Sequence, residues 1–481
     1  MPVQHVFLMT DFINSNIAIK KIAEIARKEN IAAFLVGGFV RDKLLGNENM
    51  DIDISVIGNA INFAEIVASH FKTKVDAVYD KFGTALLKLP GKDGEQIKIE
   101  FASARKESYR KSSRKPVVEF SDLINDLSRR DFTINALAVS LNNDSNETID
   151  HFCGLKDLES KILRTPLEPY KTFDDDPLRI MRACRFASQL GFSIAPETFE
   201  AMKEMRERLR LNKNEPTVVS QERITDEFMK ILSSLEPSIG LKLLFTSGVM
   251  EIIFPEVHAL EGVDQRKDFH HKDVFYHTLQ VLDNTASRSD NLWLRFAALM
   301  HDIAKPPTKK FIEGIGWTFH GHEEMGARLQ KKIFKRMRLP MDRLPYVENL
   351  VRLHLRPIAL AEEYVTDSAI RRLIFDAGDD IDDLMTLCRC DITSKDPSKV
   401  KKFLKNFDRV EKRVAEVEER DKIRNFQSPV RGEEIMKICN LAPSREVGII
   451  KKKIEEAILD GIIRNEYEAA LEYLYKIKDT I

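Results

Sequence analysis

The chain has 481 residues, 43% of them hydrophobic, and a formal net charge of −1, so it is long enough for about three domains, and its overall charge does not indicate a nucleic-acid-binding protein. Its five cysteines are scattered without a CxxC pair, which excludes a disulfide framework and fits a reducing compartment. Neither a signal-peptide pattern nor an apolar run of bilayer-spanning length is present, and we therefore expect a cytoplasmic protein.

The first predicted elements are a helix over residues 14–30 and a buried strand over 31–36. Gly37 and Gly38 follow directly, and two glycines allow the backbone to turn sharply and to approach a ligand closely. A second helix is predicted over residues 39–45, and the free N–H groups at the start of a helix suit a phosphate. This turn is therefore a candidate phosphate-binding site.

Two carboxylates come next in the chain. Asp51 and Asp53 alternate with Ile52 and Ile54, and the period of two in a strand places both carboxylates on one face. Two hard oxygen ligands beside a phosphate site suit Mg²⁺ held against a nucleotide. The alternative is a glycine turn followed by an edge strand whose aspartates are solvated.

Further along, a helix is predicted over residues 60–71, followed by strands over 73–79, 83–89 and 96–103. In the last strand, Glu100 lies on the face opposite Ile97 and Ile99. A carboxylate on a neighbouring strand is able to complete a metal site. Glu100 is therefore a candidate third ligand or general base.

Two polar segments precede the next buried strand, which is predicted over residues 136–141. Residues 104–115 carry six basic side chains against one glutamate. They are predicted to form a mobile basic loop that is either solvated or in contact with triphosphate or RNA backbone. Residues 129–135 (RRDFTIN) lead straight into the strand, which predicts a strand end that lines a site; the alternative is an N-capped turn with a salt bridge.

Three of these motifs together resemble one family. Gly-Gly-x-Val-Arg-Asp, Asp-x-Asp and Arg-Arg-Asp-Phe-Thr-x-Asn-Ala occur in the order and spacing of the class II tRNA nucleotidyltransferases and bacterial poly(A) polymerases. The resemblance implies an α+β fold. A small polymerase-β-like head, with a mixed sheet and flanking helices, is followed by a mostly helical neck, an HD domain and a tail.

The same family has a further motif, and residues 173–186 match it. Asp176, Arg179, Arg182 and Arg185 are spaced by three along a predicted helix that begins near Pro177. A carboxylate only accepts hydrogen bonds and a guanidinium only donates them. The Asp176 and Arg179 pair therefore matches the Watson–Crick edges of cytosine and adenine and mismatches those of guanine and uracil.

The resemblance assigns the template role to this same pair. The family commonly has Glu-Asp where this chain has Asp175-Asp176, which keeps the carboxylate but shortens its reach. Glu222 and Arg223, in a second predicted neck helix, are expected to support the template helix.

The resemblance also implies roles for the other motif residues. Asp51 and Asp53 are expected to hold Mg²⁺ and to act in catalysis with Glu100, and Asp131 is expected to bind the ribose hydroxyl. The remaining residues expected to contact the nucleotide, mainly through its phosphates, are Gly37, Gly38, Arg41, Arg130, Asn135, Arg182 and Arg185.

From about residue 246 the chemistry changes. The series His…His-Asp…His…His…Asp resembles the HD-domain phosphohydrolases, in which an adjacent His-Asp pair and more distant helices supply metal ligands. The resemblance implies a site for a divalent transition metal or Mg²⁺ and hydrolysis of 2′,3′-cyclic phosphates or phosphate groups at RNA ends. The candidate ligands are His277, His301, Asp302, His322, His354 and Asp391.

The expected organisation is a nucleotidyltransferase head, a helical neck, an HD domain and a helical tail that contacts tRNA, over residues 1–150, 151–245, 246–400 and 401–481. The expected function is addition of CCA to tRNA 3′ ends from CTP and ATP. A poly(A) polymerase or an enzyme that adds only C or only A is the alternative, although the arginine-rich segment expected of bacterial poly(A) polymerases is missing between Asp53 and Glu100. A different alternative is an HD phosphohydrolase with an RNA-binding head.

Overall fold

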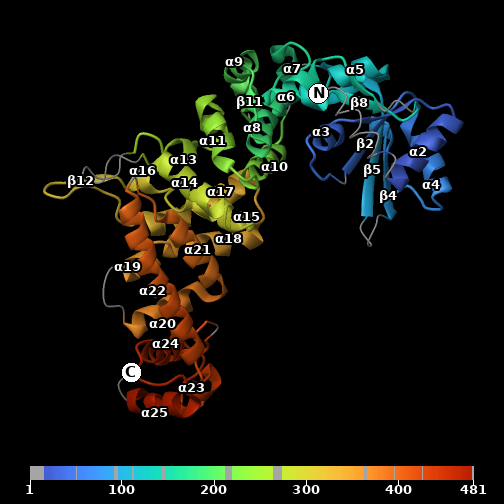
Figure 1. Ribbon diagram of the computed structural model, residues 1–481. Coiled ribbons are helices and arrows are strands. Elements are labelled where there is room, and N and C mark those ends of the chain that lie inside the picture. The colour runs from blue at the N-terminus through green and yellow to red at the C-terminus, as the bar shows by residue number, and fades with distance from the viewer. Residues whose placement is uncertain are drawn as a thin grey trace. The chain divides into compact units, whose positions relative to one another are not determined.

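The computed structural model (Figure 1) describes residues 13, 16–49, 51–90, 96–110, 113–143, 147–211, 219–263, 273–361, 366–394, 396–424 and 426–478, and only the backbone of 105–110 and 113–120. The chain divides into two compact units. The first comprises Met1–Ile231 and Ile239–Ile253, and the second Leu232–Ser238 and Phe254–Ile481.

A seven-stranded mixed sheet forms the centre of the first unit, with the strand order β3-β4-β5-β2-β1-β8-β9. The strand β2 is antiparallel to β1 and parallel to β5. The strands are β1 (Ala33–Val36), β2 (Asp51–Val56), β3 (Ala77–Tyr79), β4 (Thr84–Pro90), β5 (Gln96–Ser103), β8 (Leu137–Ser140) and β9 (Thr148–Asp150).

The alternation of side chains decides which face of this sheet is buried. Ile52 and Ile54 of β2 and Ile99 of β5 are almost fully buried, and α4 packs on β4 and β5 through an edge-to-face contact between Phe63 and Phe101. The polar residues of the same strands therefore lie on the opposite face.

Helices supply the rest of the first unit. Those next to the sheet are α2 (Ile17–Lys28), α3 (Gly38–Leu44), α4 (Ala60–His70), α5 (Leu123–Ser128) and α6 (Gly154–Glu159). Those that follow are α7 (Pro169–Asp175), α8 (Leu178–Leu190), α9 (Pro196–Met205), α10 (Gln221–Leu232), α11 (Pro237–Thr246) and α12 (Val249–Ile253). A two-stranded parallel pair joins β10 (Ile162–Leu163) to β11 (Ser193–Ile194).

The prediction of a loop in the basic segment is wrong. Its backbone forms the antiparallel hairpin of β6 (Arg105–Arg110) and β7 (Ser113–Phe120). Lys111 lies outside the described residues. The predicted strand over 73–79 is shorter than expected, since only Ala77–Tyr79 is extended.

The described part of the second unit consists of helices and one small hairpin. Its first helices are α13 (Pro255–His258), α14 (Val274–Ala286), α15 (Leu292–Met300), α16 (Lys305–Thr308), α17 (His322–Met337), α18 (Leu344–Leu353), α19 (Arg356–Leu360), α20 (Asp367–Ala377) and α21 (Ile381–Asp391). The strands β12 (Lys310–Ile312) and β13 (Gly316–Thr318) form the hairpin between α16 and α17.

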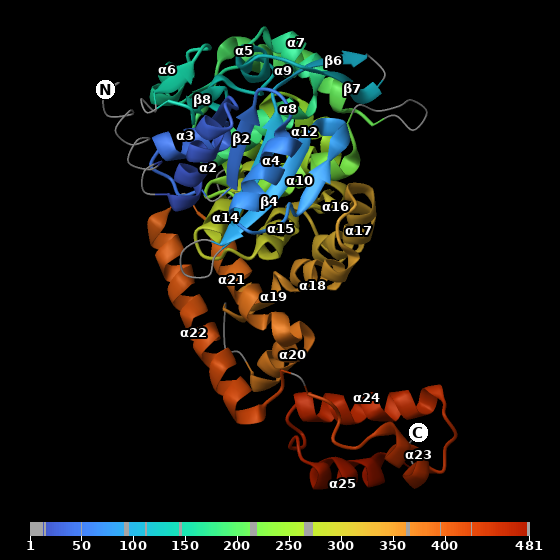
Figure 2. The same cartoon turned by 90° about the vertical axis from the view of Figure 1, so that its right-hand side faces the viewer.

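The long helix α22 (Pro397–Asp421) buries Phe407, Val410, Val414 and Val417, which is the apolar stripe of an amphipathic helix that packs on its own unit. Three short helices end the described chain, and Figure 2 shows α24 and α25 side by side. They are α23 (Gly432–Cys439), α24 (Arg445–Leu459) and α25 (Tyr467–Ile477). In the described part of the chain, no helix has both the length and the apolar character that crossing a membrane requires.

Candidate functional sites

The glycine turn of the first unit touches an aspartate and an arginine that are distant in sequence. Gly37 has φ 74°, a conformation that glycine adopts without strain. A Cβ placed on it would lie 2.5 Å from Arg130 Nη1 and 3.5 Å from Asp53 Oδ2. The structure therefore brings together three of the predicted residues around a backbone position with no room for a side chain.

Three carboxylates share one face of the sheet beside this turn. The parallel register pairs Asp53 with Glu100 and Asp51 with Lys98. Burial raises the pKa of Asp53 to about 6; Arg130 opposes this shift, and the carboxylates of Glu100 and Asp51 add to it. Oxygen ligands that repel one another in the free protein are suited to a hard divalent cation, so this set fits Mg²⁺.

The arginine of this site is anchored by a residue that sequence reasoning missed. Asp126, 1% exposed, accepts hydrogen bonds from Arg129 Nη2 at 2.7 Å, from Arg130 Nη2 at 3.4 Å and from Ser55 Oγ at 3.2 Å. The sequence did carry a signal for this contact, because Asp126 precedes Arg129 by three residues and Arg130 by four, and these spacings allow contact along a helix. Asp126 holds both guanidinium groups near the carboxylate face of the sheet.

A continuous hydrogen-bonded network connects α3 with α8. Arg41 Nη1 donates to Asn135 Oδ1 at 2.7 Å, Asn135 Nδ2 donates to Asp131 Oδ1 at 2.9 Å, and Arg182 Nε donates to Asp131 Oδ2 at 2.7 Å. Although burial raises the pKa of Asp131, Arg182 and Asn135 outweigh it and hold the pKa well below its ordinary value. Four predicted nucleotide-binding residues are thus physically linked, with Asp131 ionised at their centre.

The two arginines further along α8 share a second buried carboxylate that was not predicted. Glu227, 3% exposed, accepts from Arg185 Nε at 2.6 Å and lies 3.8 Å from Arg182 Nη1. The ring of Phe186 also contacts the guanidinium groups, with Arg185 4.1 Å and Arg41 5.0 Å from its centroid. Glu227 balances positive charges that would otherwise repel one another.

The predicted template pair lies at the junction of α7 and α8. Asp176 accepts from the backbone N–H of Leu178 at 3.1 Å and from Arg223 Nη2 at 2.8 Å, so Arg223 supports this residue as expected. Arg179 donates to the backbone carbonyls of Thr172 and Arg129. Both side chains are half-buried, and their positions are fixed by neighbouring backbone.

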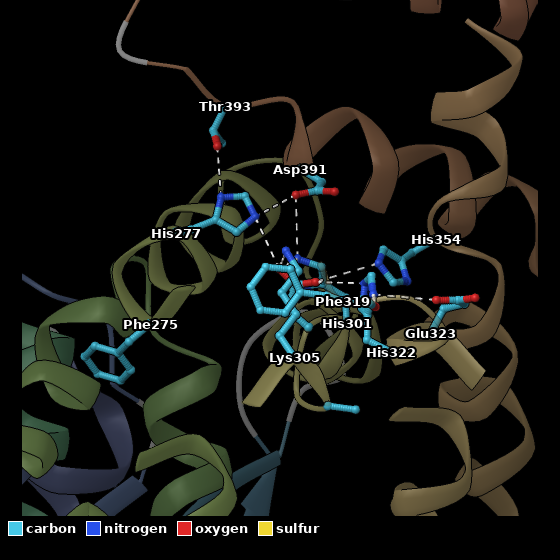
Figure 3. Close-up of polar contacts among 12 residues, drawn as sticks. Phe275, His277, His301, Lys305, Phe319, His322, Glu323, His354, Asp391 and Thr393 are labelled. Atoms are coloured by element: carbon cyan, nitrogen blue, oxygen red, sulfur yellow. Dashed lines mark hydrogen bonds and ion pairs between the residues drawn. The ribbon is translucent and has the colours of Figure 1, made fainter. Parts of the chain in front are cut away.

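In the second unit the six predicted ligands converge (Figure 3). They come from α14, from the ends of α15, α18 and α21, and from the start of α17. His277 Nε2 is 2.9 Å from Asp391 Oδ1, while Asp302 lies 3.2 Å from His301 Nε2 and 3.3 Å from His322 Nε2 through its two oxygens. His354 Nε2 is 3.9 Å from Asp302 Oδ1.

The far side of each histidine ring fixes its orientation. The Nδ1–H groups of His301, His322 and His354 donate to backbone carbonyls three residues earlier, at 2.7, 2.8 and 2.7 Å. Their Nε2 atoms are turned toward Asp302, are buried, and have no hydrogen-bond partner. Buried imidazole nitrogens gathered around a carboxylate fit a divalent cation.

The donor atoms form two groups that share Asp302. His277, His301 and Asp302 are one group, and Asp302, His322 and His354 are the other, with ligand atoms within 4.8 Å of one another in each. Burial lowers the pKa of His301, but Asp302 and Asp391 outweigh it and raise the pKa to about 10. The two carboxylates therefore favour a positive charge at this position, which fits a bound cation.

Sequence reasoning missed two supporting residues of this site. Lys305 Nζ is 2.7 Å from Asp302 Oδ2, and Thr393 Oγ1 is 3.0 Å from His277 Nδ1. Lys305 stands three residues after Asp302, a spacing that allows contact within one helical turn. The partner of His277 is 116 residues away, and no local pattern indicates it.

Family models match most of this architecture. The poly(A) polymerase head domain matches residues 33–164, the probable RNA- and SrmB-binding site of polymerase A matches 191–261, and the HD domain matches 274–421. Members of the head and HD families depend on divalent metal ions. The resemblance inferred from the motifs and the predicted fold are confirmed.

Comparisons with whole proteins agree with these family matches. The multifunctional CCA protein of Tolumonas auensis is 34% identical over 317 residues, which cover 64% of this chain and 71% of that protein. A tRNA nucleotidyltransferase, solved with a primer tRNA and an ATP analogue, is 27% identical with a TM-score of 0.55, covering 81% of this chain and 99% of that one.

The Bacillus stearothermophilus CCA-adding enzyme, solved in complex with CTP, has the same fold, with a TM-score of 0.63, 22% identity, and coverage of 96% and 97% of the two chains. The sequence identity to multifunctional CCA proteins and the order of the head and HD matches agree with the motifs found in the first and second units. This chain belongs to the family of multifunctional CCA proteins.

Proposed function

We propose that this protein adds CCA to the 3′ ends of tRNA from CTP and ATP without a nucleic-acid template, in the cytoplasm. The observation that carries the proposal is the convergence of Gly37, Asp53 and Arg130 beside Glu100. Relatives of this chain bear the name multifunctional CCA protein, and one with a solved structure was crystallised with a primer tRNA and an ATP analogue.

In this proposal the head residues hold the reacting groups. Asp51 and Asp53, with Glu100 beside them, would hold Mg²⁺. When bound there, Mg²⁺ would lower the pKa of the primer 3′-hydroxyl and stabilise the pyrophosphate leaving group. The backbone at Gly37 and the guanidinium of Arg130 contact the triphosphate, and Asp126 keeps that guanidinium in place.

The neck residues select the nucleotide. Asp176 accepts from the amino group of cytosine or adenine, and Arg179 donates to the neighbouring ring nitrogen. Arg223 and the Leu178 N–H keep the Asp176 carboxylate oriented. We assign the triphosphate to Arg182 and Arg185 and the ribose hydroxyl to Asp131. Arg182 contacts both Asp131 and Glu227, and Glu227 also binds Arg185, so the three side chains belong to one network.

The test is incubation of a tRNA that lacks its 3′ end with CTP and ATP, separately and together, followed by sequencing of the products. CCA formed only from the mixture supports the proposal. A long A tail indicates a poly(A) polymerase, and C alone or A alone indicates a partial enzyme. D53N should abolish incorporation, whereas E65Q, an exposed carboxylate change on α4, should not.

For the second unit we propose a divalent-cation site, in which Asp302 belongs to both donor groups, and hydrolysis of phosphoesters at RNA ends. A cation held there would lower the pKa of a water molecule and so supply a nucleophile. The two three-residue groups and their unpartnered Nε2 atoms support this. The six ligands hold the cations, and Lys305 keeps Asp302 oriented.

The test is metal analysis of the purified protein, followed by assays on RNA ending in a 2′,3′-cyclic phosphate or a 2′-phosphate. H301A should lose metal and hydrolysis, and H151A, an exposed histidine of the first unit, should keep both. Hydrolysis without any nucleotide incorporation would favour the alternative of an HD phosphohydrolase with an RNA-binding head.

A further inference from the structure

A small hairpin of the second unit exposes large aromatic side chains. It consists of β12 and β13 and stands out from the helices of the unit (Figure 1). Phe311 is 63% exposed and Trp317 is 40% exposed. Large apolar side chains gathered on an exposed element indicate an interaction surface, and neither of the two proposed activities uses them.

The strand register puts these aromatic rings on one face. Phe311 pairs directly with Trp317, and their rings lie edge to face with centroids 5.3 Å apart. Lys309 is on the same face, with its ammonium 4.7 Å from the Trp317 centroid. Ile312, one residue further, points to the other face. The aromatic face is therefore a defined strip with a cation beside it.

This strip begins at the metal-ligand shell. Phe319 follows Trp317 by two residues, and its carbonyl accepts the Nδ1–H of His322. Lys305 Nζ lies 5.8 Å from the Phe319 centroid and 2.7 Å from Asp302 Oδ2. Figure 3 shows Phe319 and Lys305 beside His301 and His322. The aromatic side chains thus lead from the candidate metal centre out to the exposed hairpin.

The charge of this segment indicates the ligand. Residues 305–319 contain three lysines and one glutamate, although the whole chain carries a net charge of −1. Among the described residues, Lys309 and Lys310 form no ion pair that would neutralise them. Aromatic rings that alternate with cations bind single-stranded nucleic acid, because bases stack on the rings while phosphates contact the cations.

We propose that this aromatic strip, formed by Phe311, Trp317 and Phe319 with Lys309, binds the unpaired 3′ end of an RNA and guides it to the metal centre. Bases in a duplex have no free faces, so the strip selects single strands. The inference deepens the proposed hydrolysis of RNA ends, since it names the part of the substrate that lies beyond the reacting phosphate.

The decisive experiment uses the full-length protein and the fluorescence of Trp317. The chain has two tryptophans, and W293F leaves Trp317 as the sole reporter. This choice matters because the head also binds RNA, whereas Trp317 reports only on the hairpin. The titrants are a short single-stranded RNA, the same sequence as a duplex, and inorganic phosphate.

Single-stranded RNA should quench Trp317, and the duplex and phosphate should not. F311A should weaken this binding at least about fivefold, the loss expected when one base no longer stacks. The matched control is I312A, an exposed apolar change on the other face of the same strand. Equal effects of F311A and I312A, equal binding of the duplex, or no quenching would overturn the proposal. Absence of quenching by RNA is also the result expected if the strip binds a protein instead.

A second measurement connects the strip with hydrolysis. F311A and W317A should raise KM for an RNA that ends in a 2′,3′-cyclic phosphate more than KM for a small chromogenic phosphodiester. If the wild-type protein hydrolyses neither substrate but Trp317 still binds single strands, the strip stands and the proposed hydrolysis fails. If hydrolysis is normal and quenching is absent, the strip fails alone.

Discussion

Glu100 lies directly beside Asp53 on the neighbouring parallel strand. The strand pair therefore presents two carboxylates at the same level of one sheet face, with Asp51 one step away. This relationship gives the third carboxylate a structural basis that the alternation within β5 alone did not provide, because alternation gives the face of a residue but not its neighbour.

The first prediction concerns Glu100. E100Q keeps the shape of the side chain and removes its charge, so the rate of single-nucleotide incorporation should fall, on the order of 100-fold, as when one electrostatic contact to the transition state is lost. The measurement is single-turnover incorporation at saturating CTP. Because Glu100 is exposed, the melting temperature should stay the same. A normal rate would show that Asp51 and Asp53 are sufficient.

The second prediction compares two glycines with similar positive φ angles. Gly37 has φ 74° and Gly46 has φ 76°, but only Gly37 has Arg130 and Asp53 in the way of a Cβ, whereas nothing lies within 4 Å at Gly46. G46A should lose about 1 kcal/mol of stability through its positive φ, and G37A should lose more, because φ 74° with ψ −141° is a conformation that is almost restricted to glycine. Only G37A should also lose incorporation, because its methyl group displaces Arg130. Equal activities would contradict this role of the turn.

The third prediction is a pH dependence of stability. The folded-state pKa of Asp131 is depressed by Arg182 and Asn135, so its ionisation stabilises the folded protein above the unfolded-state pKa of about 4. This contribution is lost as the pH falls through the folded-state value. The difference in free energy of unfolding between wild type and D131N should therefore be largest at neutral pH and shrink below pH of about 4. Urea titrations across this range measure it, and a constant difference would contradict the network.

The fourth prediction is that metal removal destabilises the second unit. Three buried Nε2 atoms without partners face carboxylates, so a chelator should lower the melting temperature, and a divalent cation at 100 times its Kd should restore about 2.7 kcal/mol. H301A should abolish this response, and H151A should leave it intact. Scanning calorimetry with and without cation is the measurement. A melting temperature that does not respond to chelation would show that the histidines serve packing alone.

The sequence predicted residues whose signal is local. The period of two predicted that Asp51, Asp53 and Glu100 share faces of their strands, and the resemblance to HD-domain phosphohydrolases predicted six candidate ligands, which the structure brings together. Partners that are brought together by tertiary folding carried no such signal: Glu227 reaches Arg185 across 42 residues. The hairpin of β6 and β7 was missed because a run of like charges obscures the alternation that indicates a strand.

The orientation of the histidines was also beyond sequence reasoning. It depends on backbone carbonyls three residues earlier, at Ala298, Phe319 and Val351. These contacts follow from how the helices end, which residue type does not specify. Lys305 was visible in the sequence, but only the structure shows that it contacts Asp302.

The position of Asp302 in both donor groups has a thermodynamic consequence. One of its oxygens faces His301 and the other faces His322. If both donor groups held a cation, as proposed, the first cation would fix the plane of the carboxylate and draw electron density from its other oxygen. The affinities of the two positions would then be coupled, and each occupancy would change the other by the same factor in either direction. A metal titration of this unit is therefore expected to depart from the curve of two independent sites.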